Sequence, residues 1–396
     1  MASIFYAWEL GANLGHIGKF LPIAKILRDH GHIVNWVVAH PHQATLLLQQ
    51  AEFAWMQAPT IPEQNHDNPP LNYGDILLRF GYANSNDLLG LVVAWRTLLQ
   101  LTKAQIVIAD HAPTAILAAR SLGIPVMLLC TSFSTPPQVH PTPNMRHWLS
   151  VPHEKLVNAD LLATSNINRV LAHFKRTPIT YLAELFQVEE DALCSYPELD
   201  HYPNRRPARY WGMLSSAVAD IANWPDAPGP RIFAYVRPET PHLEAALNAL
   251  HQLRGSVIIY SPGLSNELTA RYSASHLFFS PTPVDLNTIA SQATAAVNYA
   301  SPAATIAFLM AGKPVLMIPQ HLEQYLFARR VEELGAGLIH QPEAVGKNIQ
   351  TLLHRILNEP KFTQGAAAFA NKYKNFDQET VMNNIVSRIE SIVSDH

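Results

Sequence analysis

The stretch SIFYAWELGANLGHIGKFLPIAKILRDHGHIVNWVVA, residues 3–39, indicates the fold class of this chain. Five of its first six residues are aliphatic or aromatic, and the run predicts a strand over 3–8. After the loop 9–18, apolar residues at 20, 23, 24 and 27 keep a helical period, and Gly31 is a helix stop signal. A second strand is expected over 33–39. A strand, a helix and a second strand in this order are typical of a βαβ unit on a parallel sheet.

The alternation continues along the chain and then restarts. Further strands are predicted at 105–110 and 125–129, with helices near 86–99 and 113–122 and a largely helical stretch at about 153–187. Residues 58–75 are rich in Pro and Asn and are expected to form a loop. Residues 197–230 are rich in Pro, Asn and Arg, which is typical of a linker. We therefore expect a first α/β domain over 1–205, a linker over 206–230, a second α/β domain over 231–375, and a C-terminal helix over 376–396 that packs back on the first domain.

Composition excludes several classes of protein. The chain has 396 residues, of which 48% are hydrophobic and 15% charged, and a formal net charge of -3. Such a chain can bury two cores and is not disordered, and it has no basic run that would follow a nucleic-acid backbone. Two cysteines argue against a disulfide framework and favour a reducing compartment, for which we expect the cytoplasm. Neither a signal peptide nor a transmembrane helix is predicted.

A histidine and an aspartate follow two of the predicted strands. His16 lies after the strand 3–8, and Asp110 ends the strand 105–110. Side chains at the carboxyl ends of parallel strands meet at one edge of the sheet. An imidazole there can remove a proton from a hydroxyl, and a carboxylate on its other nitrogen would orient it. The alternatives are a surface loop histidine and an aspartate that caps the helix at Pro113.

These segments carry a resemblance to a known family. The stretches AWELGANLGHIGKFLPIAKILRDHGHIV, AQIVIADHAPTAILAARSLGIPVMLLCTSF and PVDLNTIASQATAAVNYASPAATIAFLMAGKPVLMIPQHLEQYLFARRVEELGAGL resemble family 1 glycosyltransferases, which use UDP-sugars. The resemblance covers roughly residues 3–340, with 150–230 matched only in placement. It implies the GT-B fold, in which two Rossmann-like, doubly wound parallel-sheet domains face each other across a cleft. The domain over 1–205 would then bind the acceptor, and the domain over 231–375 would bind the nucleotide-sugar donor. It also implies that His16 is the general base on an acceptor hydroxyl and that Asp110 orients it.

The donor side departs from the family pattern. Where the family has His-x-Gly-x-x-[ST] against the diphosphate, this chain has YASPAAT over 299–305. The imidazole is replaced by a phenol, the glycines are missing, and Pro302 has no amide proton. The helix terminus keeps amides and hydroxyls that favour an anion, and Arg237 could supply the missing positive charge, unless it is a solvated loop residue. The diphosphate-binding residues expected here are Arg237, Tyr299, Ser301, Ala303, Ala304 and Thr305.

Two further positions belong to the expected donor site. Glu323-Gln324 takes the place where the family commonly has an Asp-Gln pair that hydrogen-bonds sugar hydroxyls. The alternative for this pair is a carboxylate that interacts with the helix dipole. Recognition of the nucleotide base is expected from the backbone around Pro283 and Val284.

The acceptor side is expected to involve Phe133, His140 and Trp148, which mix aromatic rings with little charge and would suit an apolar molecule that bears a hydroxyl. Phe133 and Trp148 could equally be core residues. No CxxC, HExxH, GxxxxGK[ST] or GxSxG motif occurs, so zinc proteolysis, P-loop phosphoryl transfer and elbow-type hydrolysis are excluded. No metal is assigned.

The sequence thus predicts an inverting, metal-independent hexosyltransferase. It would use no cofactor other than a nucleotide-sugar co-substrate, linked to UDP or TDP, and a small-molecule acceptor, with no nucleic acid and no obligate protein partner. One alternative is a nucleotide-sugar-binding protein with the same fold, a weakened diphosphate site and no transferase activity. A sugar-nucleotide epimerase is a further rival, but the chain has no added carboxylate cluster for proton abstraction from the sugar.

Overall fold

The computed structural model describes residues 1–11, 15–64, 68–205, 208–214, 220–341 and 348–396. The chain divides into two compact units, Met1–Ser215 with Asp377–His396, and Ser216–Phe376. The expected linker over 206–230 therefore spans the division between them, and the last helix belongs to the first unit.

The first unit is built on a five-stranded sheet in which every pairing is parallel. The strand order is β3-β2-β1-β4-β5. The strands are β1 (Ser3–Trp8), β2 (Ile33–Val38), β3 (Trp55–Gln57), β4 (Ile106–Asp110) and β5 (Val126–Leu128).

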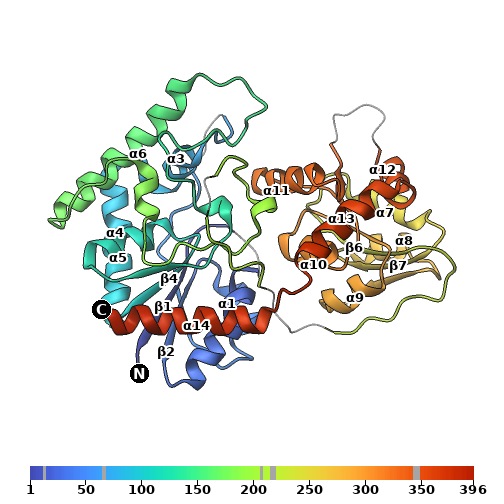
Figure 1. The fold of residues 1–396 in the computed structure, drawn as a ribbon, viewed down its shortest axis with the longest axis horizontal. Helices are drawn as coiled ribbons and strands as arrows, with labels where there is room; N and C mark the ends of the chain where they lie inside the picture. Colours follow the sequence, from blue (N-terminus) through green and yellow to red (C-terminus); the bar gives the residue numbers. More distant parts are fainter. Residues whose placement is uncertain (12–14, 65–67, 206–207, 215–219, 342–347) are drawn as a thin grey trace. The chain divides into compact units, whose positions relative to one another are not determined.

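Helices cover both faces of this sheet. They are α1 (Gly15–Asp29), α2 (Pro41–Leu48), α3 (Tyr73–Leu77), α4 (Ser85–Leu101), α5 (Pro113–Leu122), α6 (His153–His173) and α14 (Gln378–Asp395), with a π-helical turn at Leu78–Tyr82 and 3-10 turns at Ser132–Ser134, Leu182–Phe186 and Pro197–Leu199. In Figure 1 the red helix α14 lies beside α1, and its buried residues Ile385, Val386, Ile389 and Ile392 join the same core cluster as α1.

The central strand β1 shows why both faces need a cover. Ile4, Tyr6 and Trp8 pack into the cluster formed with α1 and α14. Phe5 points to the other face, where its ring lies 6.2 Å from that of Trp95 in α4. Because successive side chains alternate between faces, an almost wholly apolar strand is stable only when both faces are buried.

The second unit repeats this architecture with six parallel strands in the order β11-β10-β9-β6-β7-β8. The strands are β6 (Arg231–Tyr235), β7 (Ser256–Tyr260), β8 (Leu277–Ser280), β9 (Ala295–Asn298), β10 (Val315–Met317) and β11 (Gly337–Ile339). The helices are α7 (Leu243–His251), α8 (Asn266–Arg271), α9 (Leu286–Gln292), α10 (Pro302–Met310), α11 (Leu322–Glu333), α12 (Ile349–Asn358) and α13 (Pro360–Lys372).

This sheet is also covered on both faces. Ile232, Ala234 and Val236 of the first strand region pack in a cluster with α7 and α12. On the opposite face, Phe233 stacks on Phe308 of α10, with ring centroids 5.8 Å apart. The expectation of two doubly wound α/β domains is therefore confirmed.

Two stretches differ from the sequence-based expectation. The helix expected over 153–187 ends at His173, and a 3-10 turn at Leu182–Phe186 follows. The stretch 58–75, expected to be a loop, contains the start of α3, whose N-cap Asn72 accepts a hydrogen bond from the backbone N–H of Asp75. Within the part of the chain that the structure describes, no helix combines the length and the apolarity needed to cross a bilayer.

Candidate functional site

The order of the strands places two strand ends side by side in the first unit. β1 runs next to β4, and Trp8 pairs in register with Asp110. The chain leaves β1 toward β2 on one side, while β4 lies on the other, so the two strand ends flank the point at which the winding of the sheet reverses. The backbone N–H of Leu10 donates to the carbonyl of His111 across this point, 2.9 Å apart. In doubly wound sheets ligands bind at such a reversal.

His16 and Asp110 meet there, as the sequence predicted. His16 is the second residue of α1, and its Nδ1 lies 2.9 Å from Oδ2 of Asp110. Asp110 is 1% exposed, whereas the His16 side chain keeps 20% of its surface exposed. The buried carboxylate therefore holds one ring nitrogen, and Nε2 is the nitrogen that can accept a proton from another molecule.

Two further groups, which the sequence analysis did not identify, bind the same carboxylate. Lys19 Nζ lies 2.7 Å from Asp110 Oδ1, and the Tyr6 hydroxyl donates to Oδ2 at 2.9 Å. Burial alone would raise the pKa of Asp110, but the charges of His16 and Lys19 and their hydrogen bonds lower it to about 2. Asp110 is therefore a carboxylate throughout the neutral range.

The His16 ring packs against Trp8 and lies close to Gly11. It stacks on Trp8, with ring centroids 4.8 Å apart and planes inclined by 18°. A Cβ atom built on Gly11 would lie 3.1 Å from His16 Nε2 and 3.6 Å from His111 Nδ1. Gly11 also has a φ of +83°, which side chains disfavour. A glycine here leaves Nε2 accessible.

Glu9, the first residue after β1, is a second buried acid at this strand end. It is 4% exposed, and its carboxylate accepts the backbone N–H of Thr114 at 2.8 Å. The N-cap of α5 is Ala112, which makes no side-chain cap. The alternative role of Asp110 as the cap of this helix is therefore wrong, since Glu9 receives that amide. Burial raises the pKa of Glu9 to about 7, against the opposing effect of its hydrogen bonds with Thr114.

A row of aromatic rings leads away from His16 within the first unit. His111, which adjoins Gly11, lies 6.1 Å from Phe133 between ring centroids. Phe133 lies 5.6 Å from His201 in the same measure. Phe133 is only 7% exposed, so it is both a buried residue and part of this row.

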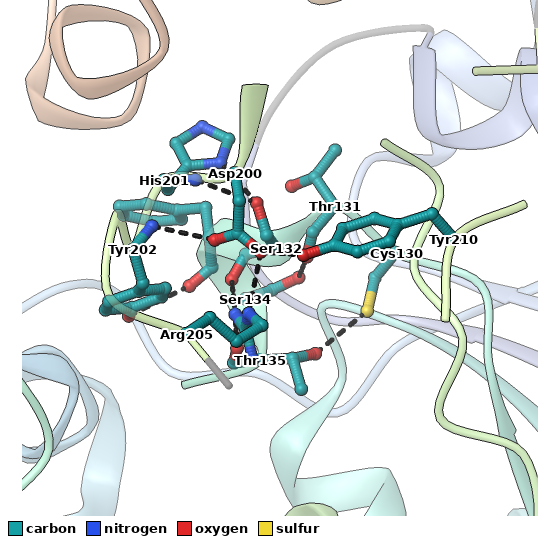
Figure 2. Close-up of polar contacts among 11 residues, drawn as sticks. Cys130, Thr131, Ser132, Ser134, Thr135, Asp200, His201, Tyr202, Arg205 and Tyr210 are labelled. Carbon is teal, nitrogen blue, oxygen red and sulfur yellow. Dashed lines mark hydrogen bonds and ion pairs between the residues drawn. The ribbon is translucent and has the colours of Figure 1, made fainter. Parts of the chain in front are cut away.

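The position of His201 is set by a network of polar contacts (Figure 2). Asp200 accepts hydrogen bonds from Arg205 Nε at 2.6 Å and from the Tyr210 hydroxyl at 2.8 Å. Arg205 donates in turn to the carbonyl of Ser132 at 3.2 Å. The Ser132 hydroxyl lies 2.8 Å from Nδ1 of His201. The buried Asp200–Arg205 ion pair thus ties the segment after the last 3-10 turn to the one after β5.

The row ends at a cavity of about 450 Å³. It is lined by residues 137, 139–145, 147, 153, 156 and 201–204, none of which is Asp, Glu, Lys or Arg. Its polar groups include four histidines, namely His140, His147, His153 and His201. Of the residues expected at an acceptor site, His140 lines this cavity, Phe133 lies one ring away, and Trp148 is 38% exposed and is not among the lining residues.

The second unit has its own reversal of winding, between β6 and β9. Tyr235 at the end of β6 pairs in register with Asn298 at the end of β9. The Tyr299 ring packs against that of Tyr235, 4.8 Å between centroids, and the Arg237 guanidinium lies 5.3 Å from the Tyr299 centroid. Arg237 is half-buried and interacts electrostatically with both phenols. The alternative of a solvated loop charge is therefore wrong. Burial raises the pKa of Tyr299, so its phenol remains a hydrogen-bond donor.

The N-terminus of α10 follows directly. Ser301 is the N-cap and makes no side-chain cap, and Pro302 is the first helical residue. The N–H of Thr305 donates to the carbonyl of Ser301 at 2.9 Å. The amides of Ala303 and Ala304 precede this first intrahelical bond and have no such partner within the helix. The Thr305 hydroxyl, by contrast, donates to Asn298 Oδ1 at 3.1 Å, so it already has an acceptor.

The remaining donor-site residues lie on neighbouring elements of the same unit. Glu323 is in the first turn of α11, and Gln324 Oε1 accepts the backbone N–H of Gln320 at 2.8 Å. The Pro283 carbonyl accepts the N–H of Asp220 at 3.0 Å. Val284 is 5% exposed.

Sequence reasoning missed Tyr6, Lys19, Glu9 and Tyr235. Lys19 had a signal, since it is a lysine three residues after His16 in a stretch, residues 17–24, that is otherwise apolar, and residues at this spacing are neighbours on a helix surface. Glu9 had one too, as an acid inside an apolar stretch. For Tyr6 and Tyr235 an aromatic residue in a strand gives no such signal. Among the described residues, no three or more His, Cys, Asp or Glu side chains are grouped so as to hold a metal ion.

Comparison with solved structures identifies the fold. The chain is similar to the spinosyn forosaminyltransferase SpnP, with a TM-score of 0.64 and 20% identity over 100% of this chain and 99% of that one. It is similar to the glycosyltransferase VinC in complex with DTDP, with a TM-score of 0.67 and 15% identity over 100% of both chains. It is also similar to the spinosyn rhamnosyltransferase SpnG complexed with spinosyn aglycone, with a TM-score of 0.65 and 16% identity over 97% of this chain and 100% of that one.

No protein-family model matches the chain, and neither does any curated protein sequence. The structural similarity extends over both units and their connection. The chain therefore has the GT-B fold of these glycosyltransferases.

Proposed function

We propose that the protein is an inverting glycosyltransferase that moves a sugar from a nucleoside diphosphate to a hydroxyl of a small, largely apolar acceptor. The observation that carries this proposal is the pair of His16 and Asp110, in which a buried carboxylate holds Nδ1 at 2.9 Å and leaves Nε2 for the acceptor. The fold of known sugar transferases supports it.

In the proposed reaction, His16 Nε2 takes the proton of the acceptor hydroxyl as that oxygen attacks the anomeric carbon. A new carbon–oxygen bond forms while the bond from the anomeric carbon to the diphosphate oxygen breaks. The nucleoside diphosphate leaves with the electron pair of that bond. A single displacement of this kind inverts the anomeric centre. Asp110 stabilises the imidazolium that forms.

The donor diphosphate is proposed to bind at the β6–β9 strand ends of the second unit. The amides of Ala303 and Ala304 at the start of α10 and the charge of Arg237 are the groups that would stabilise its phosphates. Glu323 and Gln324 are proposed to bind sugar hydroxyls, and the backbone at Pro283 and Val284 to contact the base. VinC was solved with DTDP, so a TDP-sugar is the first donor to test, with a UDP-sugar as the second.

The acceptor is proposed to extend from His16 along the aromatic row to the cavity. A cavity of about 450 Å³ without Asp, Glu, Lys or Arg in its lining favours an uncharged molecule. The histidines would supply hydrogen bonds to its polar groups. SpnG was solved with an aglycone, a molecule class that fits this description.

The two cysteines are free and buried, which supports the expectation of a reducing compartment such as the cytoplasm.

The test is sugar transfer by the purified protein. TDP- and UDP-hexoses are incubated with a panel of apolar alcohols and phenols, and products are detected by mass spectrometry and their anomeric configuration by NMR. We expect a product with inverted configuration that is formed by the His42→Ala control, in which an exposed histidine of α2 is removed, and is reduced at least a hundredfold in His16→Ala. A product formed equally well by both variants would contradict the role of His16.

One observation favours a second function. Tyr299 and Pro302 replace groups that would otherwise face the diphosphate, so the protein could bind a nucleotide sugar weakly and transfer nothing. Thermal shifts with TDP, UDP and GDP, read together with the transfer assay, separate the two, because occupancy at 100 times Kd stabilises a protein by about 2.7 kcal/mol. A shift without product in any acceptor panel would favour the binding protein.

A further inference from the structure

Lys19 is the one lysine that lies against the proposed base and its carboxylate in the described part of α1. It follows His16 by three residues, so both side chains leave the same face of the helix. The Lys19 side chain is only 7% exposed. Each oxygen of Asp110 therefore has a nitrogen partner, Lys19 on Oδ1 at 2.7 Å and His16 on Oδ2 at 2.9 Å.

The charge of Lys19 is retained despite its burial. Burial alone would lower the pKa of this ammonium, but the attraction of Asp110 outweighs that effect and raises it. A buried ammonium that lacked such a partner would be strongly unfavourable. Lys19 and Asp110 are thus a charged pair with no net charge at neutral pH.

The other titratable groups around this pair do not change that balance. Burial raises the pKa of Tyr6, of Cys130 and of Cys194, so all three are neutral there. They face the pair from β1, from the end of β5 and from the segment after the 3-10 turn at Leu182–Phe186. His40 and His111 lie farther out, beside Trp8 and Gly11 respectively.

We propose that Lys19 is a positioning residue that sets the protonation state of His16 by offsetting the negative charge of Asp110. A carboxylate without a counter-charge would stabilise the imidazolium relative to the neutral imidazole. With Lys19 bound to the same carboxylate, His16 keeps its orienting hydrogen bond while much of that electrostatic pull is cancelled. The proposal rests on the proposed function for its catalytic consequence, but not for its electrostatics.

The test is an NMR titration of the His16 ring in the free protein, which needs neither donor nor acceptor. In Lys19→Met we expect the midpoint of this titration to rise by roughly 1 pH unit relative to the unsubstituted protein, since a nearby like charge shifts titrations by this order. Lys19→Arg should keep the midpoint within a few tenths of a unit. Tyr6→Phe, which removes an uncharged donor from Asp110, should move it less than Lys19→Met does.

Lys19→Gln is the second uncharged variant, for the case that the methionine variant does not fold. It keeps a hydrogen-bond donor but no charge, and the same upward shift is expected. An unchanged or lowered midpoint in a folded uncharged variant would overturn the proposal. Since this readout does not depend on turnover, it can fail while sugar transfer is found, and it can succeed while sugar transfer is not.

The pH profile of kcat/KM gives the catalytic readout. For Lys19→Met we expect roughly a tenfold loss at pH 6, where the imidazole is then protonated, and a rate near that of the unsubstituted enzyme at pH 9. A loss of the same size at both pH values would indicate a merely structural role and overturn the proposal.

Discussion

The two sheets of this protein reverse their winding in the same way and carry opposite chemistry at that point. In the first unit, the ends of β1 and β4 bring together two acids, a lysine and a histidine. His16 and Lys19 both bind Asp110, and Glu9 accepts the backbone N–H of Thr114. In the second, β6 and β9 bring together two phenols, one guanidinium and a helix N-terminus. One topology thus provides one place that can accept a proton and another that can bind an anion.

The strand order therefore fixes where each site lies, while a few side chains fix its chemistry. The strand ends of β1 and β4 hold two buried carboxyl groups, and the different environments of these groups give them different pKa values. Asp110, beside Lys19 and His16, has a pKa of about 2, and Glu9, without a cation beside it, has a pKa of about 7. Pairs of acids that are separated in this way are typical of sites that handle protons. The second point has no acid among the groups named above.

The largest expected effect tests whether proton transfer depends on the site at the ends of β1 and β4 alone. His16→Ala should lower kcat by about 10²–10⁴, the range for a lost general base, while the Kd for TDP or UDP stays unchanged. Steady-state kinetics and calorimetric titration with the nucleotide measure the two quantities. If the nucleotide affinity falls as far as the rate, the division of labour between the two points is wrong.

The next effect concerns stability. Asp110→Asn leaves the buried Lys19 without a counter-charge, so the free energy of unfolding of the first unit should fall by about 3–5 kcal/mol at pH 7. All tryptophans except Trp224 belong to this unit, so tryptophan fluorescence in urea follows its unfolding. The conservative control is Lys19→Arg, which keeps the pair and should cost far less.

The same carboxylate predicts a pH dependence. Because the folded-state pKa of Asp110 is depressed to about 2, its stabilising contribution is complete above the ordinary value near 4 and is lost as the pH falls through 2. The unsubstituted protein should therefore lose stability between pH 4 and 2, and Asp110→Asn should lose less over that interval. Parallel curves of stability against pH for the two proteins would show that the neighbours of Asp110 do not lower its pKa.

Glu9 predicts the reverse sign. Its folded-state pKa is raised to about 7, so the neutral acid is favoured, and stability is lost as the pH rises through 7. Glu9→Gln keeps an oxygen for the Thr114 amide without the charge. It should stabilise the protein by up to about 3 kcal/mol at pH 8, and this gain should vanish toward pH 4. Glu52→Gln, at an exposed position, should show no such trend.

Much of this arrangement could be predicted from the sequence. The alternation of apolar strands and amphipathic helices predicts both sheets, and because parallel strand ends share an edge, it also predicts that His16 and Asp110 meet. The strands β3 and β11 were not predicted. β5 has the same length but lies in the apolar run PVMLL at 125–129, whereas β3 ends in Gln57 and β11 begins at Gly337. The helix expected over 153–187 is interrupted after His173, at a stretch whose Pro178 interrupts helices.

The rest of the site depends on contacts between residues far apart in the chain. Glu9 caps a helix that begins 104 residues later, at Pro113, and no local pattern encodes which acid reaches which amide. The cavity likewise requires that residues 137–147 and 201–204 come together, which the Asp200–Arg205 ion pair and its contacts to the segment after β5 achieve. Such pairings follow from tertiary packing, and a single sequence does not specify them.

The smallest predicted effect tests the site at the ends of β6 and β9. Arg237→Ala removes the guanidinium beside Tyr299 and should raise the Kd for TDP or UDP by roughly 10- to 150-fold, the equivalent of about 1.5–3 kcal/mol for a charge-assisted contact. The matched control is Arg231→Ala, since Arg231 is exposed at the start of the same strand and should change the Kd less than twofold. Similar small changes in both variants would mean that Arg237 does not bind the phosphates. Arg237→Ala should also leave the midpoint of the His16 titration unchanged, because the two residues lie at strand ends of different sheets. A shift of this midpoint would show that the two sites are coupled.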